Sequence, residues 1–255
     1  MDLAVVNMLW IGPRLGAIHA ACLRSFLRAG HRVVLHIYER PEDTPDGVEL
    51  FDARELMAAD TIIRHRKYGS LALASDVYRY RILRAGLGLY TDCDVYCVRP
   101  IADAPYIFGW ASERHITSAI LKFPAQAPVV DDLCAAADDF AFVPPWDPLP
   151  KRWYYRLRKL AGHPVTLDKQ RWGTIGPKAV TWYVHARGLE EHAAPIKVFS
   201  PLRSKQHERL YDPALDIADL TTPASLTIHL RNEMIRRRDV ESIPPSSPLG
   251  RMLAA

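Results

Sequence analysis

The first forty residues alternate between two short apolar runs and one amphipathic segment. Residues 3–12 (LAVVNMLWIG) and 31–39 (HRVVLHIYE) are rich in aliphatic and β-branched side chains, as buried strands are. Between them, residues 16–30 (GAIHAACLRSFLRAG) carry apolar side chains at helical spacing and end at Gly30, a residue typical of helix C-termini. A strand, a helix and a second strand in this order form a βαβ unit. Such a unit requires a parallel sheet with helices packed on it.

The alternation continues less regularly through the rest of the chain. We expect a long helix at residues 70–85, stopped by Gly86 and Gly88, and then a strand at residues 88–91. Further predicted elements are a short helical piece at 53–59, strands at 106–112, 116–123, 196–199 and 227–230, and helices at 127–142 and 148–160. The pattern predicts a mixed α/β sheet flanked by helices, in a single domain over residues 1–241 with a C-terminal tail at 242–255.

Composition restricts the class of protein. The 255 residues are 49% hydrophobic and 24% charged, which is ordinary for a soluble globular protein. The formal net charge of +4 is too small to indicate nucleic acid binding, but it suits an anionic ligand such as a polyphosphate or an anionic membrane surface. No segment has the roughly 18 consecutive apolar residues of a membrane span, and the N-terminus lacks a signal-peptide pattern. We therefore expect a cytoplasmic protein, with any membrane contact peripheral and at the inner face of the cell membrane.

Two aspartates, Asp92 and Asp94, lie one residue apart directly after the predicted strand at 88–91. Residues i and i+2 of an extended chain point to the same side, so both carboxylates can face one cation. In open α/β sheets ligands bind beyond the carboxyl ends of strands. Carboxylate oxygens suit Mn²⁺ or Mg²⁺, which complete their coordination with water and substrate phosphates. The competing interpretation is a solvated turn with two surface aspartates, and the pair alone does not decide between them.

A second charged pair, Asp76 and Arg79, lies in the middle of the predicted helix at 70–85. The helix is otherwise largely apolar, which favours a position in the interior or beside a cleft, where the pair could bind sugar hydroxyls and phosphate oxygens. Residues three apart on a helix face can also form an ordinary surface ion pair.

Taken together, these residues resemble a known family. The sequence S-D-x-x-R at 75–79, followed by G-x-Y-x-D-x-D at 88–94, is similar to the sugar-nucleotide motif of DxD glycosyltransferases, most of all glycosyltransferase family 32. The same separations occur in the related large bacterial toxins that glucosylate GTPases. The resemblance extends to LWIG at 9–12, TIGP at 174–177 and HLRNE at 229–233. It implies a GT-A-type fold, a Rossmann-like mixed sheet flanked by helices.

The resemblance also implies roles for particular residues. The implied donor-binding residues are Trp10, Asp76, Arg79, Tyr90, Asp92 and Asn232. The implied ligands of Mn²⁺ or Mg²⁺ are Asp92, Asp94 and His229, and the implied catalytic residues are Asp92, Asp94 and Arg79. Trp10, Tyr90 and His229 each have a competing interpretation as buried structural residues. Three departures from the family pattern are Leu87 in place of a glycine, Ile175 within TIGP, and Arg231 in place of a tryptophan. Arg231 could contact phosphate or face solvent.

The function implied by the resemblance is that of a metal-dependent, retaining glycosyltransferase. It would move a hexose from a nucleotide-sugar, with a UDP-sugar favoured, to a saccharide acceptor, which in polysaccharide or glycolipid synthesis can be lipid-linked. Asp168 and Gln170, just before TIGP, are candidates for a covalent nucleophile. The alternatives are a non-catalytic nucleotide-sugar-binding or scaffold protein of the same fold, and a toxin-like transferase with a protein acceptor. A phosphohydrolase ranks last, because the sequence shows no further carboxylate and histidine clusters of the two-metal kind.

The predicted helix at 148–160 (PLPKRWYYRLRKL) interleaves basic and aromatic residues. Its apolar side chains could pack on the sheet and leave a solvated basic face. Alternatively the helix, with the arginine run at 236–238, could rest on an anionic membrane and present the site to a lipid-linked saccharide.

Overall fold

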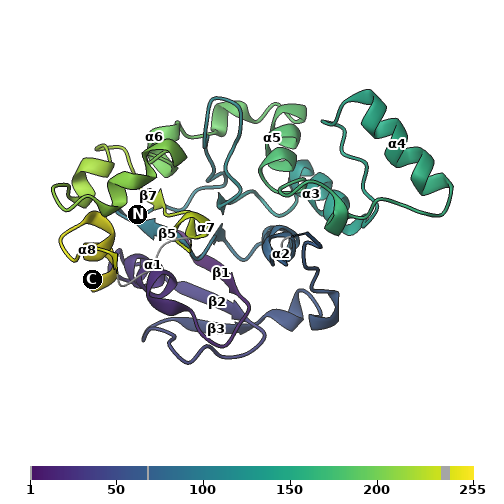
Figure 1. The fold of residues 1–255 in the computed structure, drawn as a ribbon. Helices are drawn as coiled ribbons and strands as arrows, with labels where there is room; N and C mark the ends of the chain where they lie inside the picture. Colours follow the sequence, from purple (N-terminus) through teal and green to yellow (C-terminus); the bar gives the residue numbers. More distant parts are fainter. Residues whose placement is uncertain (1, 68, 237–241) are drawn as a thin grey trace.

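The computed structural model describes residues 2–67, 69–236 and 242–255. Its larger sheet has the strand order β3-β2-β1-β4-β6 (Figure 1). These strands are β1 (Val6–Trp10), β2 (Val33–Ile37), β3 (Glu49–Asp52), β4 (Leu89–Thr91) and β6 (Ile120–Leu121). The first four strands in this order are parallel to their neighbours, and β6 is antiparallel to β4. The mixed α/β sheet flanked by helices, which the sequence predicted, is confirmed.

The chain places β2 and β3 on one side of β1 and β4 on the other. The strand order therefore changes direction between β1 and β4, and crevices at such switch points are where open α/β sheets bind ligands. Because β1 and β4 are parallel, their carboxyl ends share one edge of the sheet. Trp10 ends β1 and Asp92 follows β4 at this edge.

Helices cover both faces of the sheet. Helix α1 (Gly16–Arg28) packs Leu23 and Phe26 against one face, where Val6 and Met8 of β1 point. Helices α2 (Ala72–Arg84) and α3 (Pro128–Asp138) cover the other face, toward which Leu9 of β1 points. Successive side chains of β1 thus point to opposite faces, and both faces are buried, as in a central strand of a sheet covered on both sides.

A second, two-stranded sheet joins distant parts of the chain. Strand β5 (Val95–Cys97) pairs in antiparallel fashion with β7 (Thr227–His229), and their register sets Val95 opposite His229. Strand β5 packs on α1, and helix α8 (Pro248–Ala254) also packs on α1 (Figure 1). The pairing brings the region around residue 229 to the residues that follow β4.

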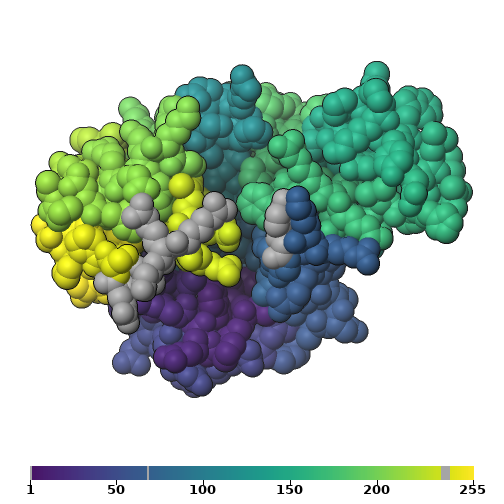
Figure 2. Space-filling model, in the orientation of Figure 1, coloured from purple at the N-terminus to yellow at the C-terminus, as the bar shows by residue number. Residues whose placement is uncertain are grey.

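The remaining helices complete the fold around these sheets. They are α4 (Leu149–Leu160), α5 (Pro177–Ala186), α6 (Ile196–Phe199) and α7 (Asn232–Ile235), with 3₁₀ turns η1 (Ala53–Glu55), η2 (Ala59–Thr61), η3 (Leu167–Lys169), η4 (Glu190–His192), η5 (Ser204–Tyr211) and η6 (Ile217–Leu220). Helix α5 packs on α3, and α4 lies at one end of the molecule, far from the C-terminal residues (Figures 1 and 2).

Two sequence-based expectations of strands do not hold. Residues 196–199 form the single helical turn α6 instead of a strand, because Pro195 provides its N-cap and a four-residue apolar run has no periodicity that separates the two states. Residues 106–112 contribute only isolated bridges, such as Ile107 to Lys122, and the strand expected at 116–123 shortens to β6.

Residues 242–255, which the sequence predicted to be a C-terminal tail, instead include a helix that packs on the fold. This helix is α8, and its Leu249 and Met252 are fully buried. The Ser247 hydroxyl accepts a hydrogen bond of 3.2 Å from the Gly250 N–H and so caps the helix. The Pro- and Ser-rich composition of the segment indicated a tail, but two well-placed apolar side chains are enough to dock it on the fold.

Candidate active site

Asp92 is held from the interior side of the molecule. Its backbone N–H donates to the Ala119 carbonyl over 2.8 Å, which fixes the residue beside the start of β6. The Tyr90 hydroxyl donates to Asp92 Oδ1 over 2.7 Å, and Arg79 Nη2 lies 3.1 Å from the same oxygen. Both side-chain contacts use Oδ1, so Oδ2 is the oxygen that remains to bind a cation.

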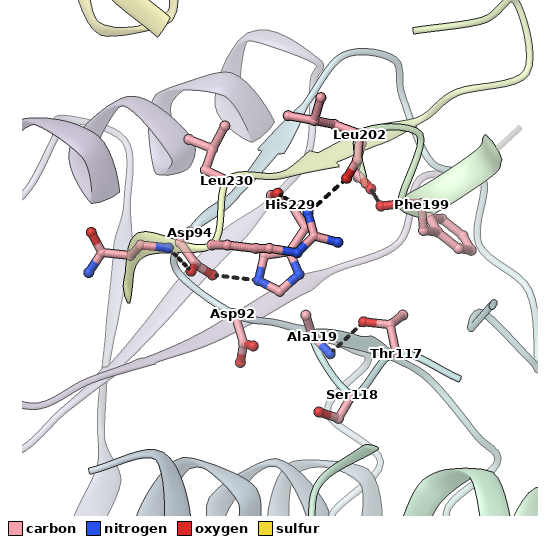
Figure 3. A network of polar contacts seen from close by, with 12 residues as sticks. Asp92, Asp94, Thr117, Ser118, Ala119, Phe199, Leu202, His229 and Leu230 are labelled. Atoms are coloured by element: carbon pink, nitrogen blue, oxygen red, sulfur yellow. Dashed lines mark hydrogen bonds and ion pairs between the residues drawn. The ribbon is translucent and has the colours of Figure 1, made fainter. Parts of the chain in front are cut away.

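Asp94 is held by the strand pairing that brings the C-terminal region to it. The Leu230 N–H donates to the Asp94 carbonyl over 2.9 Å and continues the β5–β7 ladder. His229 Nε2 then lies 3.4 Å from Asp94 Oδ1, and the Asn232 backbone N–H donates to Oδ2 over 2.8 Å (Figure 3). The sequence expected Asn232 at the site, and the structure shows that its backbone makes the contact.

Asp92, Asp94 and His229 together form a set of groups that could hold a metal ion. One ligand atom from each residue lies within 4.8 Å of the other two. Burial raises the pKa of Asp94, but the His229 imidazole and the Asn232 N–H outweigh burial and hold that pKa well below its usual range. Asp94 is therefore an ionised carboxylate at neutral pH, as a metal ligand must be. Two carboxylates and one imidazole fit Mn²⁺ or Mg²⁺.

Arg79 connects this set of groups to helix α2. Its side chain is almost fully buried, with Nη2 3.2 Å from Asp76 Oδ1 as well as near Asp92. Its Nη1 donates to the Ser118 carbonyl over 2.6 Å, and its Nε donates to the Ser75 carbonyl over 3.2 Å. The interpretation of Asp76 and Arg79 as a surface ion pair is therefore wrong. Arg79 is placed to fix the Asp92 carboxylate, and each of its nitrogens has a partner within the protein.

Asp76 lies against the TIGP segment. Burial raises the pKa of Asp76 to about 6, although Arg79 lowers it and Asp92 raises it further. A Cβ atom at Gly176 would lie only 2.9 Å from both carboxylate oxygens of Asp76, so a glycine is needed there. Ile175, which departs from the family pattern, is fully buried in the core, and its carbonyl accepts a hydrogen bond from the Tyr80 hydroxyl.

Trp10 and Tyr90 occupy different environments. Trp10 is half-buried at the end of β1, with its ring centroid 4.5 Å from that of His19. Its Nε1 is buried and has no hydrogen-bond partner among the described residues, which is uncommon for a buried polar group. Tyr90 is 1% exposed and contacts the site from behind, through its hydrogen bond to Asp92 and through its ring, over which the Arg79 guanidinium lies 4.9 Å from the centroid. His19 was not expected from the sequence, because no motif includes it.

Arg231 adopts a left-handed backbone conformation, with φ 54° and ψ 68°, and is the only non-glycine residue of the described chain with positive φ. Its Nη1 donates to the carbonyls of Leu202, over 2.8 Å, and His229, over 3.1 Å. The side chain thus braces the end of β7. This contact differs from both alternatives considered for it from the sequence, phosphate binding and exposure to solvent.

The two candidates for a covalent nucleophile are placed elsewhere. Gln170 is buried, and its Nε2 donates to the carbonyls of Phe142, over 2.7 Å, and Val165, over 3.1 Å. Its role is to hold the loop before TIGP. Asp168 lines an open groove together with basic residues.

No protein-family model matches the chain, and no curated protein matches it. Among solved structures, the chain is similar to "PaToxG Glycosyltransferase", with 13% sequence identity and a TM-score of 0.45, over 72% of this chain and 69% of that one. Within the part of the chain that the structure describes, no helix has the length and apolar character needed to cross a membrane.

Proposed function

We propose that the chain is a metal-dependent retaining glycosyltransferase with a GT-A-type arrangement, similar to glycosyltransferase family 32. One observation carries the proposal. The Asp92, Asp94 and His229 group lies at the carboxyl end of β4, at the switch point of the sheet, and Arg79 links it to Asp76. The two halves of the sequence motif, S-D-x-x-R and D-x-D, thus form one connected site.

The donor that suits this site is a nucleotide-sugar, with a UDP-sugar favoured. Trp10 would lie against the base, because its half-buried ring lies at the same sheet edge and aromatic faces stack well on bases. Asp76, at the border of the site, would accept hydrogen bonds from sugar hydroxyls. Asn232 would stay a backbone contact of Asp94, and Tyr90 would orient Asp92.

Asp92, Asp94 and His229 would hold Mn²⁺ or Mg²⁺. When bound, this cation would neutralise the negative charge that develops on the departing diphosphate. In the transfer, the bond between the hexose C1 and the diphosphate oxygen breaks, and its electron pair stays on that oxygen. An acceptor hydroxyl oxygen bonds to C1 on the same face, and its proton passes to the departing phosphate oxygen. Arg79 keeps the Asp92 carboxylate in place during this step. This front-face route needs no protein nucleophile.

The acceptor that we propose is a saccharide, lipid-linked and met at an anionic membrane surface. The observation that favours a membrane is helix α4, where Tyr155 is the only buried residue. Its large apolar side chains are exposed: Leu149, Trp153, Leu157 and Leu160. The alternative in which α4 packs these side chains on the sheet is therefore wrong. Of the arginine run at 236–238, residues 237 and 238 lie outside the described residues.

The proposed function is tested by a thermal-shift panel of UDP-, GDP-, ADP- and CMP-sugars with and without Mn²⁺. A donor at about 100 times its dissociation constant should stabilise the protein by roughly 2.7 kcal/mol, and only with the metal. Release of free sugar from the stabilising donor is then measured. Binding without turnover toward water, saccharide or protein acceptors would favour the scaffold alternative, and no stabilisation by any nucleotide-sugar would reject the assignment.

A further inference from the structure

An open groove with a volume of about 700 Å³ lies between the segment before α2 and the segment that leads into α5. Its walls carry Arg66, Lys169, Arg171, Trp172 and Lys178, and we call it the basic groove. None of the donor-binding or metal-binding residues implied by the sequence lines it. It is much larger than the space beside Asp76, and it is wide enough to hold part of a saccharide or lipid headgroup.

The charge of the basic groove is strongly unbalanced. Lys67 also lines it, and Asp168 is its one acidic residue among those described. Arg66, Lys169, Arg171 and Lys178 form no salt bridge with any described residue, unlike Arg32, Arg81, Arg84, Arg187 and Arg251, which are each paired with a carboxylate. Burial lowers the pKa of Lys178, the neighbouring Arg171 guanidinium lowers it further, and the Asp147 carboxylate offsets these effects only in part. The cations therefore repel one another, and an anion between them would relieve this repulsion.

The basic groove continues toward the candidate active site. His65, Arg171 and Trp172 line both this groove and a narrower pocket whose far wall includes Asp76 and Thr174. A ligand with its charged part in the groove could thus reach the border of the site. Trp172 is 54% exposed, so its indole offers a flat apolar face between the cations and Asp76. Such faces suit sugar rings and prenyl chains alike.

We propose that the basic groove binds a phosphate or diphosphate group of the acceptor, with Trp172 against the moiety next to it. Several convergent cations around one acidic side chain suit the multiple negative charge of a diphosphate better than a single carboxylate. That this ligand is the acceptor rests on the proposed function, whereas the presence of an anion site does not. The diphosphate could belong to a soluble sugar phosphate or to a lipid-linked saccharide.

The test is calorimetric titration with inorganic pyrophosphate in EDTA, which removes metal-dependent binding at the donor site. The double variant Lys169→Glu and Lys178→Glu should weaken pyrophosphate binding by about tenfold or more, since it replaces two charge-assisted contacts by repulsion. The matched control is Lys197→Glu with Lys205→Glu, two exposed lysines on α6 and η5 that change the net charge equally. The control should bind pyrophosphate as the wild type does, and both variants should show the wild-type circular dichroism spectrum.

Failure of wild-type protein to bind pyrophosphate, or equal weakening in both double variants, would overturn the proposal. A second titration uses farnesyl diphosphate. Tighter binding of farnesyl diphosphate than of pyrophosphate supports the site with a lipid-linked source, and equal binding supports it with a soluble source. The groove variant should keep the stabilisation by UDP and Mn²⁺. If pyrophosphate binds in the groove but no nucleotide-sugar stabilises the wild type, the anion site stands and the proposed glycosyltransferase fails.

Discussion

Only Cys93 separates Asp92 from Asp94 in the sequence, but the two aspartates are held by different parts of the fold. The side chains that contact Asp92 belong to α2 and β4, which are parts of the main core. Asp94 is contacted by the His229 side chain, at the end of β7, and by the Asn232 backbone N–H shortly after it. Loss of one carboxylate should therefore remove a metal ligand without removing the other ligand's support.

The first residue-scale prediction is that Asp94→Ala abolishes turnover and Mn²⁺-dependent donor binding while the fold is kept. Removal of one of two carboxylates takes away a main anionic ligand of the cation, and we expect a loss of about 100-fold or more in metal affinity. The measurements are the thermal shift by UDP with and without Mn²⁺ and the release of free sugar. Wild-type rates in this variant, or full wild-type activity in excess EDTA, would contradict the metal site.

The second residue-scale prediction concerns Arg79. Arg79→Lys should lose most transfer activity and about 3 kcal/mol of unfolding free energy, because one ammonium cannot replace a fork that serves two carboxylates and two carbonyls in the interior. Arg81→Lys is the control on the same helix, since the Arg81 ion pair with Asp138 is partly exposed and worth little. Urea unfolding and transfer rate are measured for both. Equal behaviour of the two variants would show that Arg79 has no special role.

At the residue scale, the sequence alone indicated several residues that the structure brings close together. The spacing of Asp92 and Asp94 after a strand predicted that both could face one cation, and the structure places His229 with them. It could not predict that Asn232 contributes its backbone N–H, since any residue except proline carries that group. It also could not distinguish a tyrosine that touches a ligand from Tyr90, which holds the carboxylate behind it.

At the scale of elements, the pairing of β5 with β7 decides the site. The register that sets Val95 opposite His229 also sets the imidazole beside Asp94. The sequence predicted the strand at 227–230 but not its partner β5. Val95–Cys97 are three consecutive buried residues, and so short an apolar run shows no alternation that would identify a strand. Strand β3 was missed for a related reason, since it lies at the sheet edge and its side chains are mostly exposed. Helix α5, directly after TIGP, was missed as well.

The prediction at the scale of elements concerns how stability depends on pH, through a histidine that links β1, β2 and α2. His36 of β2 is fully buried, with Nδ1 2.9 Å from the Tyr78 hydroxyl and Nε2 3.0 Å from Asn7 Oδ1. Burial lowers the pKa of His36 from 6.5 to about 4. The unfolded chain therefore binds the proton more readily, so this residue's contribution to stability is present above pH 6.5 and is lost as the pH falls toward 4. Between pH 7 and pH 5 the loss should be about 2 kcal/mol.

The measurement is urea unfolding of the wild type and His36→Gln at pH 7 and pH 5. The variant should be less stable at pH 7, but its stability should fall by about 2 kcal/mol less on acidification. His163→Gln, which changes an exposed histidine, should keep the wild-type pH dependence. The same acid-induced loss in His36→Gln as in the wild type would contradict the assignment.

At the scale of the whole molecule, cationic and exposed apolar side chains occur together on helix α4, at one end of the fold. The cations of this helix (Figure 2) include Arg152, Arg156 and Arg158. Lys151 of α4 is among the groups that lower the pKa of Lys178 in the basic groove, so the two ammonium groups lie within electrostatic range of each other. A membrane at α4 would therefore bring lipid-linked ligands close to the groove.

The whole-molecule prediction is salt-sensitive binding to vesicles that contain phosphatidylglycerol, and weak binding to pure phosphatidylcholine. Three arginines near such a surface contribute about 3 kcal/mol in addition to the apolar side chains. Leu157→Ser with Leu160→Ser should reduce co-sedimentation without loss of stability, because both leucines are 60% exposed or more. Leu50→Ser, on β3, is the control. Absent binding at low salt, or equal binding by both variants, would favour a soluble glycan or protein acceptor.

The β5–β7 pairing also fixes when, during synthesis, the site can exist. A nascent chain that has reached residue 200 contains every strand of the larger sheet and both carboxylates, but neither His229 nor the backbone that holds Asp94. Contacts over so many residues form late, because the long loop between them must first be closed. A ribosome-bound chain of that length would therefore lack part of the candidate cation site, and the proposed chemistry could begin only after β7 has been translated.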